Sequence, residues 1–168
     1  ELFSDRTVEK AYLAVVEGIP ASTQWVCRLP LGPDPSAWGR HRVDDVEGKP
    51  AETEFRVLAS AANRTLIEAR PHTGRTHQIR LHLRAAGCPV VGDDLYGRND
   101  RLGLGLRAVR LSYRDPFTRR PVRIQAPVDE WCARFGFPRD PAASRGDEGP
   151  APTPLAPKAT PPAVRWTT

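Results

Sequence analysis

The sequence contains no methionine, not even at position 1, and no apolar run that approaches the roughly 20 residues of a membrane-spanning helix. The short acidic start, Glu1 to Arg6, has neither the basic nor the apolar region of a secretory signal peptide. We therefore expect no membrane partner for these 168 residues. The missing methionine also leads us to expect that the chain begins inside a longer protein.

Cysteine is scarce, and its spacing excludes two classes of small protein. Cys27, Cys88 and Cys132 are far apart, odd in number and outside any C-x-x-C arrangement. A disulfide framework or a thiolate zinc site would need paired or closely spaced cysteines. We expect a protein of the reducing cytoplasm.

Lysine is almost absent, so arginine carries nearly all the positive charge. Only Lys10, Lys49 and Lys158 are lysines among the 25 basic residues, and the net charge is +5. Arginine offers a planar fork for phosphate and a flat face for stacking on bases, which favours a polyanionic partner. GC-rich codon usage would raise the arginine content as well, so composition alone does not decide for nucleic acid.

The pattern of residues predicts one α+β domain over 1–137 and a disordered Pro/Ala-rich tail over 138–168. The strands are predicted from alternation and β-forming residues, and the segment 33–48 is predicted to be a loop because it is rich in Pro, Gly and Asp. A short closing helix is predicted over 129–135. The expected strands or strand regions are 10–16, 25–31, 53–57, 65–69, 104–113 and 122–124.

The stretch His72 to His82, HTGRTHQIRLH, concentrates histidine and arginine around one glycine. Its apolar period fits a strand or a helix, but Thr76 as an N-cap candidate and the stop signal at Gly87 favour a helix. One face of that helix would then carry His77, Arg80 and Arg84, opposite the apolar residues.

Three readings of this stretch compete. A metal site is disfavoured because His72, His77 and His82 are five residues apart, which separates the last two by roughly 140° on a helix. A solvated helix face would need no ligand at all. An anion site is favoured by four arginines without an intervening acid, since guanidiniums near a helix N-terminus attract phosphate. These arginines are Arg70, Arg75, Arg80 and Arg84.

Five motifs in order make the chain resemble the RluA-type pseudouridine synthases from about residue 6 to about residue 127. The sequence of these motifs is far more specific than any one of them. They are K-A-Y with Val15 and Gly18, then G-K-P-A-E-T ending at Thr53, T-G-R-T-H-Q-I-R ending at Arg80, G-C-P-V-V-G-D ending at Asp93, and Tyr96 with Gly97.

The resemblance implies a cofactor-free RNA enzyme with the family's α+β catalytic domain, a mixed and largely antiparallel sheet with a few helices. A flipped uridine is attacked by an aspartate, the glycosidic bond breaks, and the base is rejoined through C5. By resemblance, Tyr12 stacks on the uracil and Arg80 pairs with the aspartate, and both roles suit these side chains. The RNA-binding residues are expected to be Arg70, Gly74, Arg75, His77 and Arg84, where Gly74 would allow a positive φ or a close approach of the backbone to RNA.

The nucleophile motif of the family, H-R-L-D followed by T-S-G, is not in this sequence. The most similar stretch, His41 to Asp44, follows the tyrosine motif instead of preceding it and lacks the T-S-G continuation. We therefore expect the C-terminal part of a catalytic domain that lacks its first strands and is inactive alone. An inactive RNA-binding module is the alternative. The implied partner is structured RNA, ribosomal RNA more than transfer RNA, and the implied state is a monomer.

Overall fold

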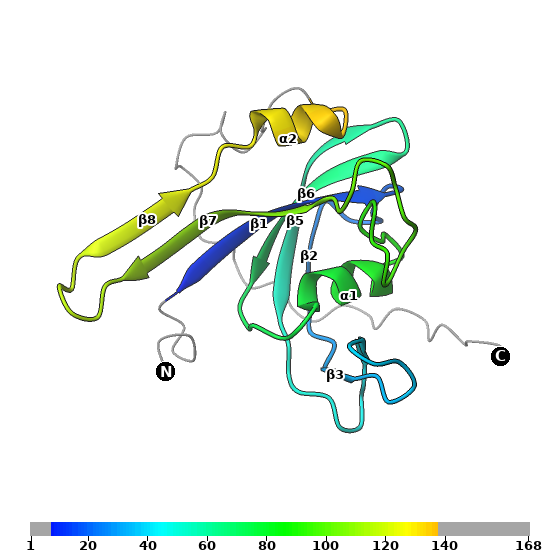
Figure 1. Ribbon diagram of the computed structural model, residues 1–168, viewed down its shortest axis with the longest axis horizontal. Helices are drawn as coiled ribbons and strands as arrows, with labels where there is room; N and C mark the ends of the chain where they lie inside the picture. Colours follow the sequence, from blue (N-terminus) through cyan, green and yellow to red (C-terminus); the bar gives the residue numbers. More distant parts are fainter. Residues whose placement is uncertain (1–7, 138–168) are drawn as a thin grey trace.

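A six-stranded sheet of order β2-β5-β6-β1-β7-β8 forms the centre of the computed structural model, which describes residues 8–137 (Figure 1). Every pairing among these strands is antiparallel, and the expected α+β class is confirmed. The predicted tail over 138–168 lies outside the described residues. The elements are β1 (Glu9–Glu17), β2 (Gln24–Cys27), β3 (Leu31–Pro33), β4 (His41–Val43), β5 (Thr53–Ala61), β6 (Arg64–Pro71), α1 (Gln78–Ala85), β7 (Leu106–Arg114), β8 (Pro121–Gln125) and α2 (Asp129–Arg134).

Strand β1 is buried on both faces, which explains its nearly continuous apolar sequence. Leu13 and Val15 point into the cluster that contains Trp131 of α2, while Ala14 and Val16 point into the cluster beneath α1. Successive side chains of a strand alternate between the two faces, so one strand contributes to both cores. Helix α1 thus covers one face of the sheet and α2 the other (Figure 1).

The pairing between β1 and β7 contains one irregularity in its register. Ala11 pairs with Arg110 and Tyr12 pairs with Ala108, so Val109 is an extra residue on β7. Such a β-bulge locally changes which side chains share a face.

The segment 33–48, expected to be a loop, contains a strand. β4 pairs with β3 in a separate two-stranded sheet, and the predicted single run from Trp25 to Leu31 is divided between β2 and β3. Strands of three residues are too short to show a period in the sequence. The turn after β4 is closed by Asp44, whose carboxylate accepts the N–H groups of Val46 and Glu47.

The start of α1 also differs from expectation. The N-cap is His77, in the left-handed region at φ 55°, and not Thr76. No side chain caps at that position; instead the Gln78 side chain, one residue later, accepts the N–H of Arg75 at 2.9 Å. The buried amide of Gln78 thus fixes the loop before the helix and does not cap a free N–H of its first turn. Among the described residues, no helix is long and apolar enough to cross a membrane.

Candidate functional site

A buried chain of hydrogen bonds fixes the loop before α1 to the sheet. Gln78 Oε1 accepts from Thr73 Oγ1, and Gln78 Nε2 donates to Thr53 Oγ1 at 2.9 Å. Thr53 Oγ1 lies 3.0 Å from His82 Nδ1, and His82 Nε2 lies 3.0 Å from the Leu29 carbonyl oxygen. The motif residues Gln78 and Thr53, together with His82, are thus structural: they hold the T-G-R loop in place.

The direction of each bond in this chain defines the protonation of His82. A carbonyl can only accept, so His82 Nε2 carries the proton and Nδ1 accepts the Thr53 hydroxyl. Burial lowers the pKa of His82, although the Leu29 carbonyl opposes this. The carbonyl fixes a proton on Nε2, and the lowered pKa keeps the ring neutral at neutral pH, so that Nδ1 is free to accept.

This neutral histidine predicts a loss of stability in acid. The folded-state pKa lies below the ordinary value of 6.5. The unfolded chain therefore binds more protons in the window below 6.5, and stability is complete above that pH and falls as pH decreases. The free energy of unfolding, measured with denaturant from about pH 7.5 to 5.5, should fall by up to about 1.4 kcal/mol per pH unit from this group. His82→Leu should be less stable throughout but show a flatter pH profile; an unchanged slope would contradict the assignment.

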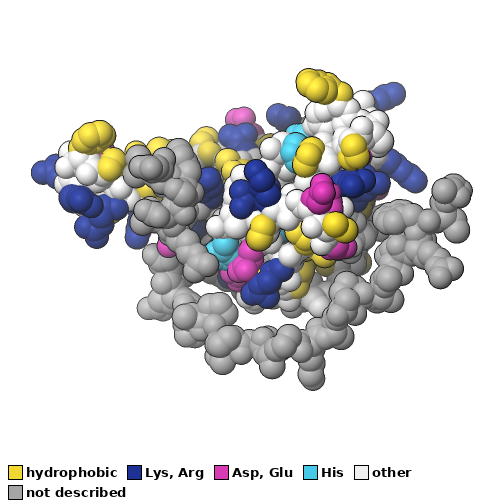
Figure 2. Space-filling model, turned by 90° about the horizontal axis from the view of Figure 1, so that it is seen from below, with side chains coloured by type: hydrophobic (Ala, Val, Ile, Leu, Met, Phe, Trp, Pro, Cys, Tyr) yellow, Lys and Arg dark blue, Asp and Glu magenta, His cyan; other side chains and the backbone are white. Residues whose placement is uncertain are grey.

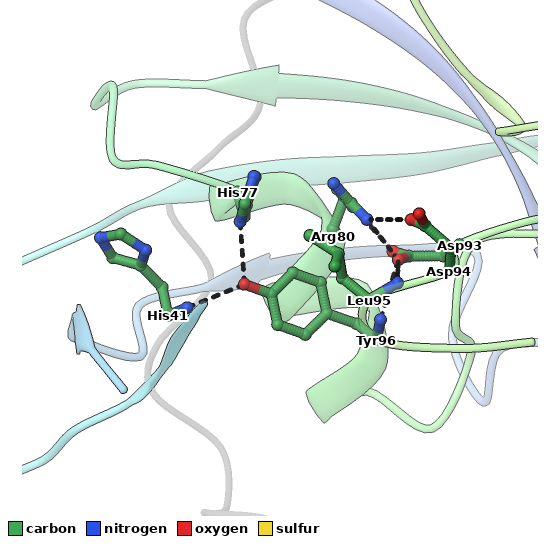
Figure 3. Close-up of polar contacts among 7 residues, drawn as sticks. All are labelled: His41, His77, Arg80, Asp93, Asp94, Leu95 and Tyr96. Carbon is green, nitrogen blue, oxygen red and sulfur yellow. Dashed lines mark hydrogen bonds and ion pairs between the residues drawn. The ribbon is translucent and has the colours of Figure 1, made fainter. Parts of the chain in front are cut away.

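Arg80 and Asp93 form the most buried ion pair of the site. Arg80 Nε lies 2.9 Å from Asp93 Oδ2 and Nη2 lies 2.5 Å from Oδ1, a bidentate arrangement, while Asp94 contacts Nη2 from solvent (Figure 3). The side chains are only 11% and 1% exposed. Burial opposes ionisation of Asp93, but Arg80 and two backbone N–H groups outweigh it and lower the pKa of that carboxyl. The bond to Asp93 raises the pKa of Arg80.

The backbone around Asp93 leaves its carboxylate little freedom. Asp93 Oδ1 accepts the N–H groups of Leu95 and Tyr96 at 3.1 and 2.9 Å. Gly92 before it has φ +70°, and a Cβ there would lie 2.0 Å from the Gly103 carbonyl oxygen. Only glycine fits this position. Asp93 was not identified as a site residue from the sequence, although it ends a motif that the resemblance rests on.

Tyr96 connects Arg80 to the β3–β4 hairpin. The Arg80 guanidinium carbon lies 5.1 Å from the centroid of the Tyr96 ring, within cation–π range. The Tyr96 hydroxyl accepts the His41 N–H at 2.9 Å and lies 2.8 Å from His77 Nδ1 (Figure 3). Burial, and then the nearby Arg80 charge, lower the pKa of His77. In neutral His77, Nδ1 accepts a hydrogen bond from the Tyr96 hydroxyl, and the ring proton is then on Nε2.

Tyr12 lies on the same face of the sheet as α1. It is half-buried at the edge of the cluster that contains Ile79 and Leu83 of α1, and it pairs with Ala69 and Ala108 on the neighbouring strands. The small alanines leave space beside the ring. Within the described residues the Tyr12 hydroxyl has no hydrogen-bond partner.

The remaining predicted RNA-binding residues do not all gather here. Gly74, Arg75 and Arg84 flank or end α1 and are exposed, and Arg75 Nε donates to the Pro50 carbonyl at 3.0 Å. Gly74 does not have the positive φ that the sequence suggested; His77 has it instead. The space around Gly74 is open, because a Cβ at this residue would meet nothing within 4 Å.

Arg70 is separated from the site. Ala69 faces α1, so the next residue, Arg70, points to the opposite face. There it forms an ion pair with buried Glu68, which Arg56 also contacts.

The histidines of the described residues do not gather into a metal site. His82 is enclosed by its two hydrogen bonds, His77 bonds to Tyr96, and exposed His72 lies 3.8 Å from Glu54. Among residues 8–137 there is no group of three or more His, Cys, Asp or Glu positioned to hold a metal ion.

Comparison with known proteins gives consistent similarities. A family profile described as RNA pseudouridylate synthase matches residues 1–85. An uncharacterized RNA pseudouridine synthase of Zymomonas mobilis is 34% identical over 146 residues, which cover 82% of this chain and 64% of that protein. The ribosomal large subunit pseudouridine synthase C of Escherichia coli K12 is 37% identical over 146 residues, covering 80% and 46%.

Solved structures agree. The human RNA pseudouridylate synthase domain containing 1 superimposes with a TM-score of 0.65 and 32% identity, covering 74% of this chain and 56% of that one. A second solved structure, the human RNA pseudouridylate synthase domain containing 4, superimposes with a TM-score of 0.62 at 23% identity, which shows a similar fold. The chain spans 64% of the length of the Zymomonas protein, 46% of the Escherichia coli synthase and 43% of the corresponding synthase of Pasteurella multocida.

Proposed function

Because the chain belongs to the RluA-type family of RNA pseudouridine synthases, we propose that it forms part of an enzyme that isomerises uridine to pseudouridine in structured RNA. Ribosomal RNA is favoured over transfer RNA, since several relatives are named ribosomal large subunit synthases. The observation that carries the proposal is the fixed guanidinium of Arg80, which is positioned beside the T-G-R loop by a buried carboxylate.

Arg80 is suited to orient a nucleophilic carboxylate. Asp93 occupies Nε and Nη2, while Nη1 has no hydrogen bond or ion pair within the described part of the chain. A second carboxylate can therefore pair with Nη1 of the same guanidinium, while Asp93 and exposed Asp94 contact Nη2. Such a cation stabilises the ionised form of an aspartate and fixes its direction. Asp93 acts through Arg80 and is a positioning residue.

Tyr12 is proposed to stack on the uracil. It lies on the α1 face, half-exposed and next to small residues, so that part of its ring is accessible to a flipped base. An aromatic ring is the platform that flipped or single-stranded bases use.

The phosphate contacts are proposed for the loop and helix around Arg80. Arg75 and Arg84 supply exposed guanidiniums, and neutral His77 supplies its Nε2 N–H. The open space at Gly74 suits a close approach of RNA to the backbone. A phosphate contact by Arg70 would involve RNA on the other face of the sheet.

The nucleophilic aspartate is proposed to come from residues that precede Glu1 in the native protein. The only H-R-x-D stretch ends at Asp44, whose carboxylate is engaged by backbone N–H groups, first that of Glu47, and these bonds lower its pKa. That aspartate closes a turn. We further propose a monomer without cofactor that acts in the cytoplasm, where thiols such as Cys27 and Cys88 remain reduced.

The test is to translate the DNA upstream of Glu1 in the same reading frame and to express the chain with that extension, here termed the extended enzyme. The 168-residue polypeptide should form no pseudouridine in ribosomal RNA transcripts, as detected by carbodiimide modification and primer extension. The extended enzyme should form it, and replacement of the aspartate in its H-R-L-D motif should abolish it. Pseudouridine formed by the 168 residues alone would refute the proposed origin of the nucleophile.

The upstream sequence also distinguishes the alternative. If a start codon lies just before Glu1 and no such aspartate precedes it, the protein lacks a nucleophile. Binding of RNA without isomerisation would then be its function.

A further inference from the structure

The β7–β8 hairpin, Leu106–Gln125, carries the entire net charge of the chain. It contains six of the 25 basic residues and one of the 20 acidic ones, which leaves 19 of each elsewhere. Its arginines are Arg107, Arg110, Arg114, Arg119, Arg120 and Arg123. Basic side chains gather at the end of the molecule where this hairpin lies (Figures 1 and 2).

Strand register places most of these arginines on one face. Arg107 pairs with Leu13 and Arg110 with Ala11, and both partners alternate onto the α2 face of β1. Arg123 pairs with Ser112, two residues from Arg110, and belongs to the same face. Arg114, two residues after Ser112 on β7, also belongs to this face. The opposite face of the hairpin is apolar and carries Leu111, Tyr113, Val122 and Ile124.

These charges are not compensated within the described structure. Arginines elsewhere in the sheet form ion pairs, as Arg56, Arg64 and Arg70 do. None of the six hairpin arginines has an ion pair among residues 8–137, and the single acid, Asp115, uses its carboxylate to accept two backbone N–H groups of the turn. Arg110 and Arg123 lie opposite Gln125 and Ser112, so they are diagonal neighbours on the same face, without an acid between them. Such a face attracts an anionic partner.

The tip of the hairpin adds an exposed aromatic ring. Phe117 is 93% exposed, next to exposed Arg119 and Arg120. Six residues separate Ala108, the partner of Tyr12, from the end of β7 at Arg114, a span of roughly 20 Å at 3.3 Å per residue. The tip is therefore too distant to contact the nucleotide that stacks on Tyr12.

We propose that the arginine face and tip of the β7–β8 hairpin bind the phosphodiester backbone of RNA that flanks the target uridine. The inference rests on the proposed function, because that function supplies RNA as the polyanion. The exposed guanidiniums of Arg110, Arg114 and Arg123 match the repeated charges of a nucleic-acid backbone, and contacts of this kind bind without regard to sequence. Because these arginines lie on the α2 face, the RNA would pass around the end of the sheet. The hairpin would then hold the substrate at a distance while Tyr12 and Arg80 act on one base from the α1 face.

The test measures binding of the 168-residue chain to an RNA stem-loop of arbitrary sequence as a function of salt. The variant combines Arg110→Gln, Arg120→Gln and Arg123→Gln, three exposed side chains without a hydrogen bond or ion pair among residues 8–137. Affinity at low salt should fall on the order of tenfold or more, and the slope of log K against log salt should decrease by about 2.7, or 0.9 per lost phosphate contact. Thermal unfolding should be unchanged or occur at higher temperature, since repulsion is removed.

A matched control removes the same charge elsewhere. Arg98→Gln, Arg101→Gln and Arg134→Gln together replace three exposed arginines outside the hairpin. This control should retain most of the wild-type slope. Equal slopes in the two triple variants, or a wild-type slope in the hairpin variant, would overturn the inference. The proposed function fails separately, if the extended enzyme forms no pseudouridine.

Discussion

Replacing Arg80 with glutamine should reduce kcat/KM of the extended enzyme for pseudouridine formation by about a thousandfold or more, equivalent to about 4 kcal/mol of transition-state stabilisation. The substitution removes the cation that keeps the proposed nucleophile ionised and aimed. It also leaves Asp93 as a buried carboxylate without its bidentate partner. The variant should therefore be destabilised as well, by about 3 to 5 kcal/mol.

A second variant distinguishes a loss of catalysis from a loss of activity through unfolding. Arg80→Gln combined with Asp93→Asn removes the uncompensated charge, and an amide pair can bond across the same gap, so the double variant should recover stability. Its activity should stay near that of Arg80→Gln. Recovery of activity together with stability would show that Arg80 is needed only for the fold. Asp93→Asn alone should lower kcat more than it raises KM, because Arg80 stays but is less firmly oriented.

Replacing Tyr12 with leucine should lower kcat/KM by about 10- to 100-fold, since stacking of one base on an aromatic ring contributes about 1 to 3 kcal/mol. Tyr12→Phe keeps the ring face and should retain most of the activity. Single-turnover assays of the extended enzyme on a ribosomal RNA fragment measure both.

A second half-buried tyrosine provides the control for this prediction. Tyr113 lies on the neighbouring strand β7, on the apolar face of the hairpin. Tyr113→Leu should leave kcat/KM close to the wild-type value. If Tyr12→Leu and Tyr113→Leu behave alike, or if Tyr12→Phe is as inactive as Tyr12→Leu, the stacking role is wrong.

Local pattern was sufficient to predict the strands and helices that have a long, clear period. β1 carries a long run of apolar and β-forming residues, β5 and α1 carry alternating or helical apolar positions, and these elements appear where expected. β4 could not be predicted, because a three-residue strand has no period. The start of α1 at His77 could not be predicted either, because the loop before it is held by a buried glutamine that bonds to Thr53, 25 positions away in the sequence.

The site was predicted from motifs, and its supporting groups were not. Resemblance pointed to Arg80, but only the structure places Asp93 and Tyr96 around it, 13 and 16 residues further along the chain. Nothing in the local sequence says that Arg70 and Arg80 lie on opposite faces of a sheet. That separation follows from strand pairing, which is long-range information.

The extra residue at Val109 determines on which face of β7 the arginines lie. Arginines at 107 and 110 have opposite parity, and in an unbroken strand they would point in opposite directions. The bulge changes the phase by one residue, so that Val109 can join the core beneath α2 while Arg110 remains on the same side as Arg107. A deletion or insertion of one residue in the middle of β7 would rearrange this electrostatic surface more than any single substitution, with almost no change in composition.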